Sequence, residues 1–220
     1  MIPVTNRVGL EVGGPSQMFM SNGTIPLYKD ATDLDCVCFD KETVWNNADS
    51  KFTPEGKVLG IFIEAEATDL PLHPEVYDYI LSSHQLEHCA NPIKALFEFY
   101  RVLKDKGDFL LILPEKKYTF DHQRPDTTFA HLKTDYLSQT TERDLTHFGE
   151  IMHLHDIFRD PEAPQTIEGF AIRSLNNYKN RCLHHHVFNR NVVFEMLNFV
   201  GFKSIVHEPQ GLHLIFRATK

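Results

Sequence analysis

Short apolar segments alternate with segments of helical periodicity through the first half of the chain. Strand-like stretches occupy residues 8–12, 34–39, 58–63, 77–83 and 108–114. The last two are apolar over nearly their whole length, which is typical of strands in a parallel sheet that is covered on both faces. The pattern therefore predicts an α/β domain with a mostly parallel sheet.

Two helices have clear start and stop signals. Asn91 is a good N-cap with Pro92 at the first helical position, and Gly107 is expected to end this helix. A second helix is expected between Asn189 and Gly201. Apolar residues recur at helical spacing in the first of them, at Ile93, Leu96, Phe97, Tyr100 and Leu103.

The chain finishes with two strand-like stretches, "FKSIVHE" and "HLIFRAT", which only "PQGL" separates. A connection this short is compatible with an antiparallel hairpin and not with a crossover between parallel strands. The mostly parallel sheet is therefore expected to close with an antiparallel hairpin.

Residues 115–188 form a long excursion between the fifth strand and the last helix. A segment of this length is too long for a plain loop, so it is expected to carry its own helices and to act as an acceptor-binding lid. We expect residues 1–220 to form a single domain with 115–188 inserted. Because the first strand begins near residue 8, with no helix before it to cover the sheet, the domain is expected to be excised from a longer multidomain protein.

Composition narrows the class of protein. The 220 residues are 42% hydrophobic and 24% charged, as in ordinary globular domains, and no apolar run approaches the roughly 20 residues that cross a bilayer. The net charge of −8 argues against a nucleic-acid partner. The four cysteines form no C-x-x-C pair and no signal segment is present, which favours the cytoplasm.

The stretch "GLEVGGPS", residues 9–16, suggests a strand that ends in a tight turn against a ligand. The dinucleotide pattern G-x-G-x-x-G is absent, because Gly13 and Gly14 are adjacent and no third glycine follows. Two glycines alone also serve ordinary tight turns. The ligand therefore has to be inferred from other segments.

Residues 66–115, "EATDLPLHPEVYDYILSSHQLEHCANPIKALFEFYRVLKDKGDFLLILPE", carry several motifs in a characteristic order. The segment resembles the middle of class I S-adenosylmethionine-dependent methyltransferases of the type 11-like group, with acid-Ala-x-x-Leu-Pro, Leu-Glu-His and Arg-Val-Leu-Lys-x-x-Gly. The stretches "YTFDHQRPDTTFAHL" and "RCLHHHVF" are similar to a narrower subset, the methyltransferase domains associated with glycosyltransferases in surface-glycan synthesis.

The resemblance implies a Rossmann-like fold with a seven-stranded sheet, helices on both faces and an insertion after strand five. It implies S-adenosylmethionine as methyl donor and S-adenosylhomocysteine as product. Glu11 would meet the donor's ammonium group, Asp35 the ribose, with Asp33 as its rival, and Ser83 would lie beside the sulfonium. The full set of implied cofactor-binding residues is Glu11, Gly13, Gly14, Pro15, Asp35, Glu66, Ala67, Thr68, Ser83 and His84.

A hydroxyl acceptor also needs a base, and histidine is the usual choice because its pKa lies near neutrality. His122, oriented by the preceding Asp121, and His84 are equal candidates, and His88 ranks below them. A hydrogen-bonded structural role is the alternative for most histidines of the insertion. Of the 13 histidines, eight lie in residues 115–188: His122, His131, His147, His153, His155, His184, His185 and His186.

Acceptor-binding residues are expected in the same insertion. Arg124, His155 and His185 are the candidates, although Arg124 and Asp126 are equally suited to a surface ion pair. "HLHD" (153–156) and "HHH" (184–186) could offer ligands to a divalent ion, but no spacing fixes a coordination geometry. No metal is therefore predicted.

The leading hypothesis is an O-methyltransferase that acts on a sugar hydroxyl of a glycan by in-line transfer, with a carbohydrate acceptor and glycosyltransferase domains as partners. A methyltransferase for another small acceptor, such as a phenol, a lipid-like molecule or an amine, is the first alternative. A non-catalytic domain of the same fold that organises glycosyltransferases is the second. A nicotinamide-dependent reductase is disfavoured by the missing third glycine and by the terminal hairpin.

Overall fold

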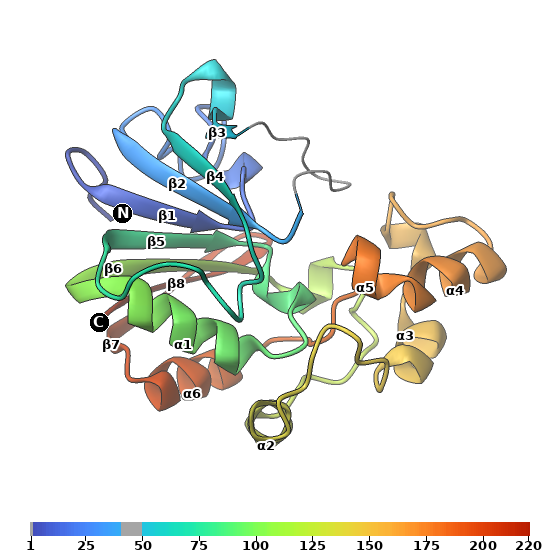
Figure 1. Ribbon diagram of the computed structural model, residues 1–220. Coiled ribbons are helices and arrows are strands. Elements are labelled where there is room, and N and C mark those ends of the chain that lie inside the picture. Colours follow the sequence, from blue (N-terminus) through green and yellow to red (C-terminus); the bar gives the residue numbers. More distant parts are fainter. Residues whose placement is uncertain (1, 41–49) are drawn as a thin grey trace.

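The computed structural model describes residues 2–40 and 50–220. Its strands form one sheet in the order β3-β4-β2-β1-β5-β6-β8-β7, with helices packed against it (Figure 1). The strands are β1 (Val8–Val12), β2 (Asp33–Cys38), β3 (Lys51–Phe52), β4 (Gly60–Glu64), β5 (Tyr77–Ser83), β6 (Leu103–Pro114), β7 (Lys203–Gln210) and β8 (His213–Thr219). The architecture is the predicted Rossmann-like α/β fold.

The pairing directions confirm the antiparallel finish. Strands β4, β2, β1, β5 and β6 run parallel to one another, whereas β8 is antiparallel to β6 and β7 is antiparallel to β8. The described sheet has eight strands instead of the expected seven, because β3 adds a short antiparallel edge to β4. A strand of two residues has no alternation that a sequence pattern could reveal.

Helices α1 (Pro92–Val102) and α6 (Arg190–Val200) cover one face of the sheet (Figure 1). Both predicted caps are confirmed: the side chains of Asn91 and Asn189 accept hydrogen bonds from backbone N–H groups at 3.1 and 3.0 Å. Gly201 ends α6 in the left-handed conformation with φ of 115°. Helix α1 ends before Gly107 because Leu103 already pairs with Tyr77 as the start of β6.

The opposite face differs from the expectation of helices on both sides. Within residues 2–40 and 50–220, no α-helix packs on this face. It is covered by residues 17–31, which contain only the 3-10 turn η1 (Gln17–Phe19) and bury Phe19, Leu27 and Tyr28 against the sheet. Gly23 and Pro26 interrupt this segment, which prevents a regular helix from forming there.

Residues 115–188, called the insertion below, carry helices of their own as expected. Figure 1 shows α3, α4 and α5 gathered beyond one end of the strands, with α2 below them. Their small core joins Ile151, Ala163, Phe170 and Leu183. The elements are η4 (Lys116–Tyr118), α2 (Phe129–Leu137), α3 (Phe148–Leu154), η5 (Ile157–Arg159), α4 (Ile167–Leu175) and α5 (Asn177–Asn180).

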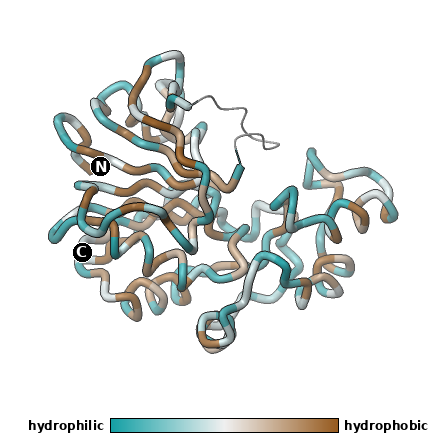
Figure 2. The backbone as a smooth tube through the Cα atoms, in the orientation of Figure 1, coloured by the Kyte–Doolittle hydropathy of each residue, from teal (hydrophilic) through white to brown (hydrophobic). Residues whose placement is uncertain are grey.

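Hydrophobic residues concentrate in the sheet and hydrophilic ones in the outer turns (Figure 2). The cysteines Cys36, Cys38, Cys89 and Cys182 are all free thiols, and Cys36 and Cys89 are buried. In the part of the chain that the structure describes, no helix has the length and the apolar character needed to cross a membrane.

Candidate active site

A cavity of about 780 Å³ lies where the carboxyl ends of the central strands meet the insertion. Its volume is in the range of small-molecule and cofactor sites, and the carboxyl end of an open α/β sheet is where such folds bind ligands. The sheet contributes Val12, Val37, Ser83 and Pro114 to its wall. From the insertion come Tyr118, Thr119, Phe120, Glu142, Arg159, Pro161, Glu162, Arg181 and His184.

The turn after β1 presents its backbone to this cavity. Gly13 has φ of +85°, and its N–H donates to the Val37 carbonyl at 2.8 Å. A Cβ atom on Gly13 would lie 2.5 Å from the Gln85 Cγ, and one on Gly14 would lie 2.4 Å from the Glu11 Cδ. Both positions therefore require glycine, because neighbouring side chains fill the space behind the turn.

Glu11 stands behind the turn and does not line the cavity. It is 1% exposed, and its carboxylate accepts hydrogen bonds from the Tyr28 hydroxyl at 2.8 Å and from the Ser16 N–H at 3.0 Å. Burial raises the pKa of Glu11 to about 8, although both hydrogen bonds act in the opposite direction. The side chain thus supports the turn from inside the protein, and a direct contact with a ligand in the cavity is not available to it.

A second part of the wall joins the loop after β4 to the end of the insertion. Glu66 and Ala67 line the cavity, and Arg181 binds the Glu66 carboxylate through both terminal nitrogens, at 2.5 and 3.2 Å. The Arg181 guanidinium also lies 4.8 Å from the centre of the Phe39 ring, another wall residue. This cation–π contact and ion pair tie the insertion to the sheet.

A buried pair of Asp121 and His184 lies on the insertion side of the cavity. His184 lines the cavity, and its Nδ1 lies 2.5 Å from an Asp121 carboxylate oxygen. Burial lowers the pKa of His184, but the charge and hydrogen bond of Asp121 outweigh it, so the pKa lies above its ordinary value. Burial acts on Asp121 in the raising direction, and His184 with Arg124 nevertheless hold its pKa at about 2. The Nε2 atom of His184 remains as the ring nitrogen not bound to Asp121.

The end of β5 adds further imidazoles. Ser83 and His84 line the cavity, and the His84 Nε2 lies 3.0 Å from the Nδ1 of His213, which also lines it. Glu87 lies beside His84, with its Oε1 3.4 Å from the His84 Nδ1, and is only 1% exposed. Burial raises its pKa, but His84, His88 and His184 together more than offset this, so the pKa of Glu87 lies below its ordinary value. The wall therefore carries a buried negative charge among histidines.

Comparison with known proteins bears on what the cavity holds. Residues 21–111 match the family model described as a methyltransferase domain. No curated protein sequence matches the chain. These residues contain β2, β4, β5 and α1, and hence much of the sheet-side wall.

Solved structures share the fold. A methyltransferase from Aquifex aeolicus is 14% identical with a TM-score of 0.54 over 99% of this chain and 82% of its own. One from Mesorhizobium loti is 10% identical with a TM-score of 0.54 over 100% of this chain and 94% of its own. The CurJ carbon methyltransferase is 10% identical with a TM-score of 0.54, and this chain spans 50% of its length. At such identities the likeness shows the fold alone.

The family match covers residues 21–111, less than half of the chain, and the solved structures share the fold along nearly its whole length. Together these findings support an S-adenosylmethionine-dependent methyltransferase. The family match and the fold imply S-adenosylmethionine as methyl donor and S-adenosylhomocysteine as product. The cavity volume is in the range of small-molecule and cofactor sites, and Gly13 and Gly14 add no side chains to its wall.

Most of the cofactor-binding residues expected for the methyltransferase lie together. Three do not line the cavity: Glu11, Asp35 and Thr68. The Asp35 carboxylate accepts hydrogen bonds from the Ile61 N–H at 2.9 Å and from the Tyr77 hydroxyl at 3.0 Å, because it lies in the middle of β2. Those expected residues that do line it are Gly13, Gly14, Pro15, Glu66, Ala67, Ser83 and His84.

The acid that follows β2 is Asp40, which the sequence analysis passed over. It comes directly after Phe39, a residue of the cavity wall, whereas Asp33 and Asp35 lie at the start and middle of the strand. The run "TDLDCVCFD" contains three acids, Asp33, Asp35 and Asp40. Which of them follows the strand can be decided only when the residue at which the strand ends is known. Asp40 is exposed and, like Asp35, is not among the residues that line the cavity, so the acid for the ribose hydroxyls stays a prediction.

His122, one of the two expected bases, does not line the cavity of the methyltransferase. Its Nε2 lies 3.9 Å from an Asp156 oxygen, and Asp121 turns away from it toward His184. Asp121 therefore does pair with an imidazole as expected. The imidazole is that of His184, 63 residues after Asp121 in the chain, and not that of His122. His84 keeps its place at the cavity.

The expected acceptor-binding residues Arg124, His155 and His185 do not line the cavity and are engaged by other groups of the protein. Arg124 is 1% exposed and donates to Asp121, Glu150 and two backbone carbonyls, which leaves little donor capacity for a substrate. His155 pairs with Asp160 at 3.1 Å. His185 is buried against Asn177, and burial lowers its pKa to about 3. Asp126 pairs with Lys116 at 2.8 Å and not with Arg124.

Proposed function

We propose that this methyltransferase transfers the methyl group to a sugar hydroxyl and that His184 is the general base. The observation that carries the proposal is the Asp121–His184 pair, which is buried on one side and lines the cavity on the other. Asp121 fixes the Nδ1 atom as hydrogen-bond donor, so Nε2 is left to accept a proton, as in other carboxylate–histidine pairs.

The reaction is an in-line displacement. When bound, S-adenosylmethionine supplies an electrophilic methyl group on its sulfonium. The acceptor oxygen forms the new C–O bond, the C–S bond breaks with its electron pair staying on sulfur, and the hydroxyl proton passes to the His184 Nε2. Holding the two reactants in line can supply roughly 7–11 kcal/mol of the barrier. The negative Glu87 carboxylate complements a sulfonium nearby.

The two walls of the cavity suit two ligands. The turn of Gly13 and Gly14 with Ala67 and Glu66 offers backbone groups and small side chains to the donor. The insertion offers the acceptor a different surface, which combines aromatic rings, hydroxyls and charges. Its residues are Tyr118, Thr119, Phe120, Arg159 and Glu162. The hydroxyls and charges of this surface can form hydrogen bonds with a polyhydroxylated acceptor, and its aromatic rings can pack against a sugar ring. The insertion would thus act as the acceptor-binding lid.

A panel of acceptors tests the proposal. The protein is incubated with S-adenosylmethionine and with free sugars, glycan-linked sugars, phenols and amines, and both methylated products and S-adenosylhomocysteine are measured by mass spectrometry. We expect O-methylated sugar. Methylated phenol or amine without methylated sugar would overturn the acceptor class, and binding of the donor without turnover of any acceptor would favour the non-catalytic alternative.

A further inference from the structure

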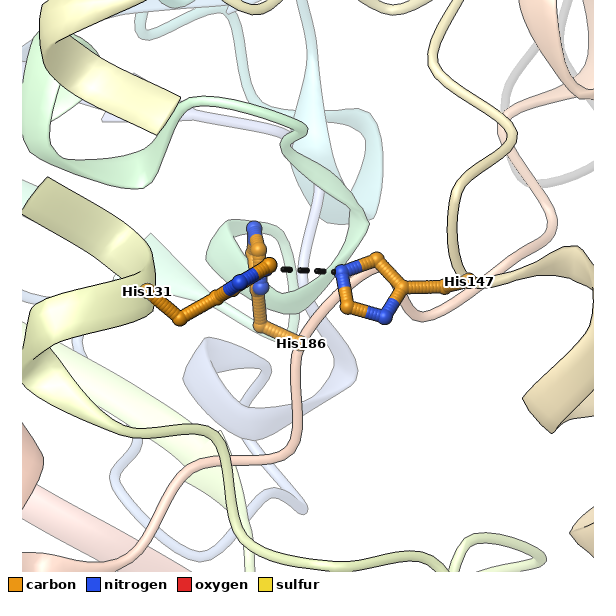
Figure 3. A group of neighbouring side chains, drawn as sticks. All are labelled: His131, His147 and His186. Atoms are coloured by element: carbon orange, nitrogen blue, oxygen red, sulfur yellow. Dashed lines mark hydrogen bonds between the residues drawn. The ribbon is translucent and has the colours of Figure 1, made fainter. Parts of the chain in front are cut away.

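Three histidines converge outside the cavity. His131 lies in α2, His147 precedes α3, and His186 lies between α5 and α6. One ring nitrogen of each lies within 4.8 Å of the others, and the Nε2 atoms of His131 and His147 are 3.0 Å apart (Figure 3). None of the three lines the methyl-transfer cavity. Figure 3 shows the side chains reaching toward one another from three separate segments.

A carboxylate stands beside this group. Asp135 lies one helical turn after His131, and its Oδ2 is 3.2 Å from the His131 Nε2 and 3.8 Å from the His186 Nε2. Apart from these two contacts, that oxygen is buried and makes no hydrogen bond. The side chain of His186 is 1% exposed, and its Nδ1 makes no hydrogen bond either, whereas its Nε2 lies 3.3 Å from the Ala90 carbonyl. Buried polar atoms are almost always partnered, so unpaired atoms in one place indicate a missing ligand.

We infer that His131, His147, His186 and Asp135 bind a divalent transition-metal ion, with Zn²⁺ the best match. Imidazole with one carboxylate suits zinc and its neighbours better than magnesium or calcium. In a tetrahedral zinc site with Zn–N bonds of 2.0–2.1 Å, two ligand nitrogens lie about 3.3 Å apart. The present separations come close to this arrangement, and the exposed edge of His131, 37% accessible, gives an ion a way in.

Such an ion would join segments that are distant in the sequence. It would tie α2 and the start of α3 to the segment that carries His184, two residues before His186. Its role would be to fix these parts of the insertion relative to one another, and it needs no part in the chemistry. The inference therefore does not depend on the acceptor or on the base.

A second group of potential ligands exists in the described residues: Glu87, His88 and His184. Two of its ring nitrogens are already engaged, because Asp121 binds the His184 Nδ1 and the Leu183 carbonyl lies 3.1 Å from the His88 Nδ1. This group also lines the cavity. The ion is assigned to the first group because that group combines three imidazoles with a neighbouring carboxylate and lies outside the cavity, whereas the Glu87 carboxylate oxygens, which also make no hydrogen bond, belong to the cavity wall.

The test uses the full chain without a histidine tag. The protein is loaded with Zn²⁺, dialysed against metal-free buffer and analysed by inductively coupled plasma mass spectrometry. We expect one zinc per chain in the wild type and in His153→Ala, a matched change of an exposed histidine in α3. His131→Ala and His186→Ala should bind zinc at least about 10-fold more weakly, and Asp135→Asn should lie between. Circular dichroism checks the fold of each variant.

X-ray absorption of the zinc-loaded wild type keeps the inference testable if a variant fails to fold. We expect nitrogen and oxygen ligands at about 2.0–2.1 Å with three imidazoles. Sulfur ligands at about 2.3 Å, no stoichiometric zinc in the wild type, or loss of zinc in His88→Ala but not in His131→Ala would each overturn the assignment.

Discussion

Replacing His184 by asparagine lowers the methyl-transfer rate by about 10²–10⁴-fold, the usual contribution of a positioned general base. Asparagine can still donate a hydrogen bond to Asp121, so the buried carboxylate keeps a partner, but no group remains to accept the acceptor's proton. Affinity for S-adenosylhomocysteine should stay at the wild-type level, because the donor wall is unchanged. Single-turnover rates and calorimetry on the same preparation measure the two quantities.

His122→Ala is the matched control, because His122 lies outside the cavity and should leave the rate near that of the wild type. His84→Ala tests the remaining candidate, which lines the cavity and pairs with His213. If His84→Ala stops turnover while His184→Asn does not, the base is His84. If neither change slows the reaction, the mechanism does not use a histidine base.

Replacing Arg124 by methionine lowers the free energy of unfolding by about 3–5 kcal/mol, the range for breaking a buried ion pair from one side. The guanidinium is 1% exposed and joins Asp121, Glu150 and the carbonyls of His184 and His185. Its loss leaves the Asp121 charge with less compensation and frees two backbone carbonyls inside the protein. Urea unfolding at neutral pH, followed by circular dichroism, gives the change.

Lys116→Met provides the comparison, since Lys116 pairs with Asp126 at a partly exposed position and such pairs contribute about 0–1 kcal/mol. The experiment also decides between two roles for Arg124. A variant that unfolds like the wild type but loses affinity for the acceptor would restore the acceptor-binding role expected from the sequence.

Much of the fold follows from local patterns. The buried strands β5 and β6, the caps Asn91 and Asn189, and the short connection of the final hairpin each depend on neighbouring residues, so sequence reasoning identified them. The short strand β3 and the irregular cover of residues 17–31 depend on packing between distant segments. Neither leaves a periodic signal, and the sequence therefore favoured seven strands with helices on both faces.

The site divides in the same way. Gly13, Gly14, Glu66 and Ser83 follow strands whose carboxyl ends must meet, so their convergence could be predicted. The partner of Asp121 could not, because His184 is 63 residues away and the adjacent His122 was the natural choice. Arg181 binds Glu66 although the two residues are 115 positions apart, and no sequence motif around Arg181 indicates this contact.

Co-crystallisation with S-adenosylhomocysteine tests the central claim most directly. We predict that the product analogue occupies the cavity at the carboxyl ends of the strands, with its amino-acid end at the turn of Gly13 and Gly14, its adenine beside Ala67 and its sulfur on the side of His184. A well-ordered complex with this cavity empty, or with the ligand bound elsewhere, would contradict the account.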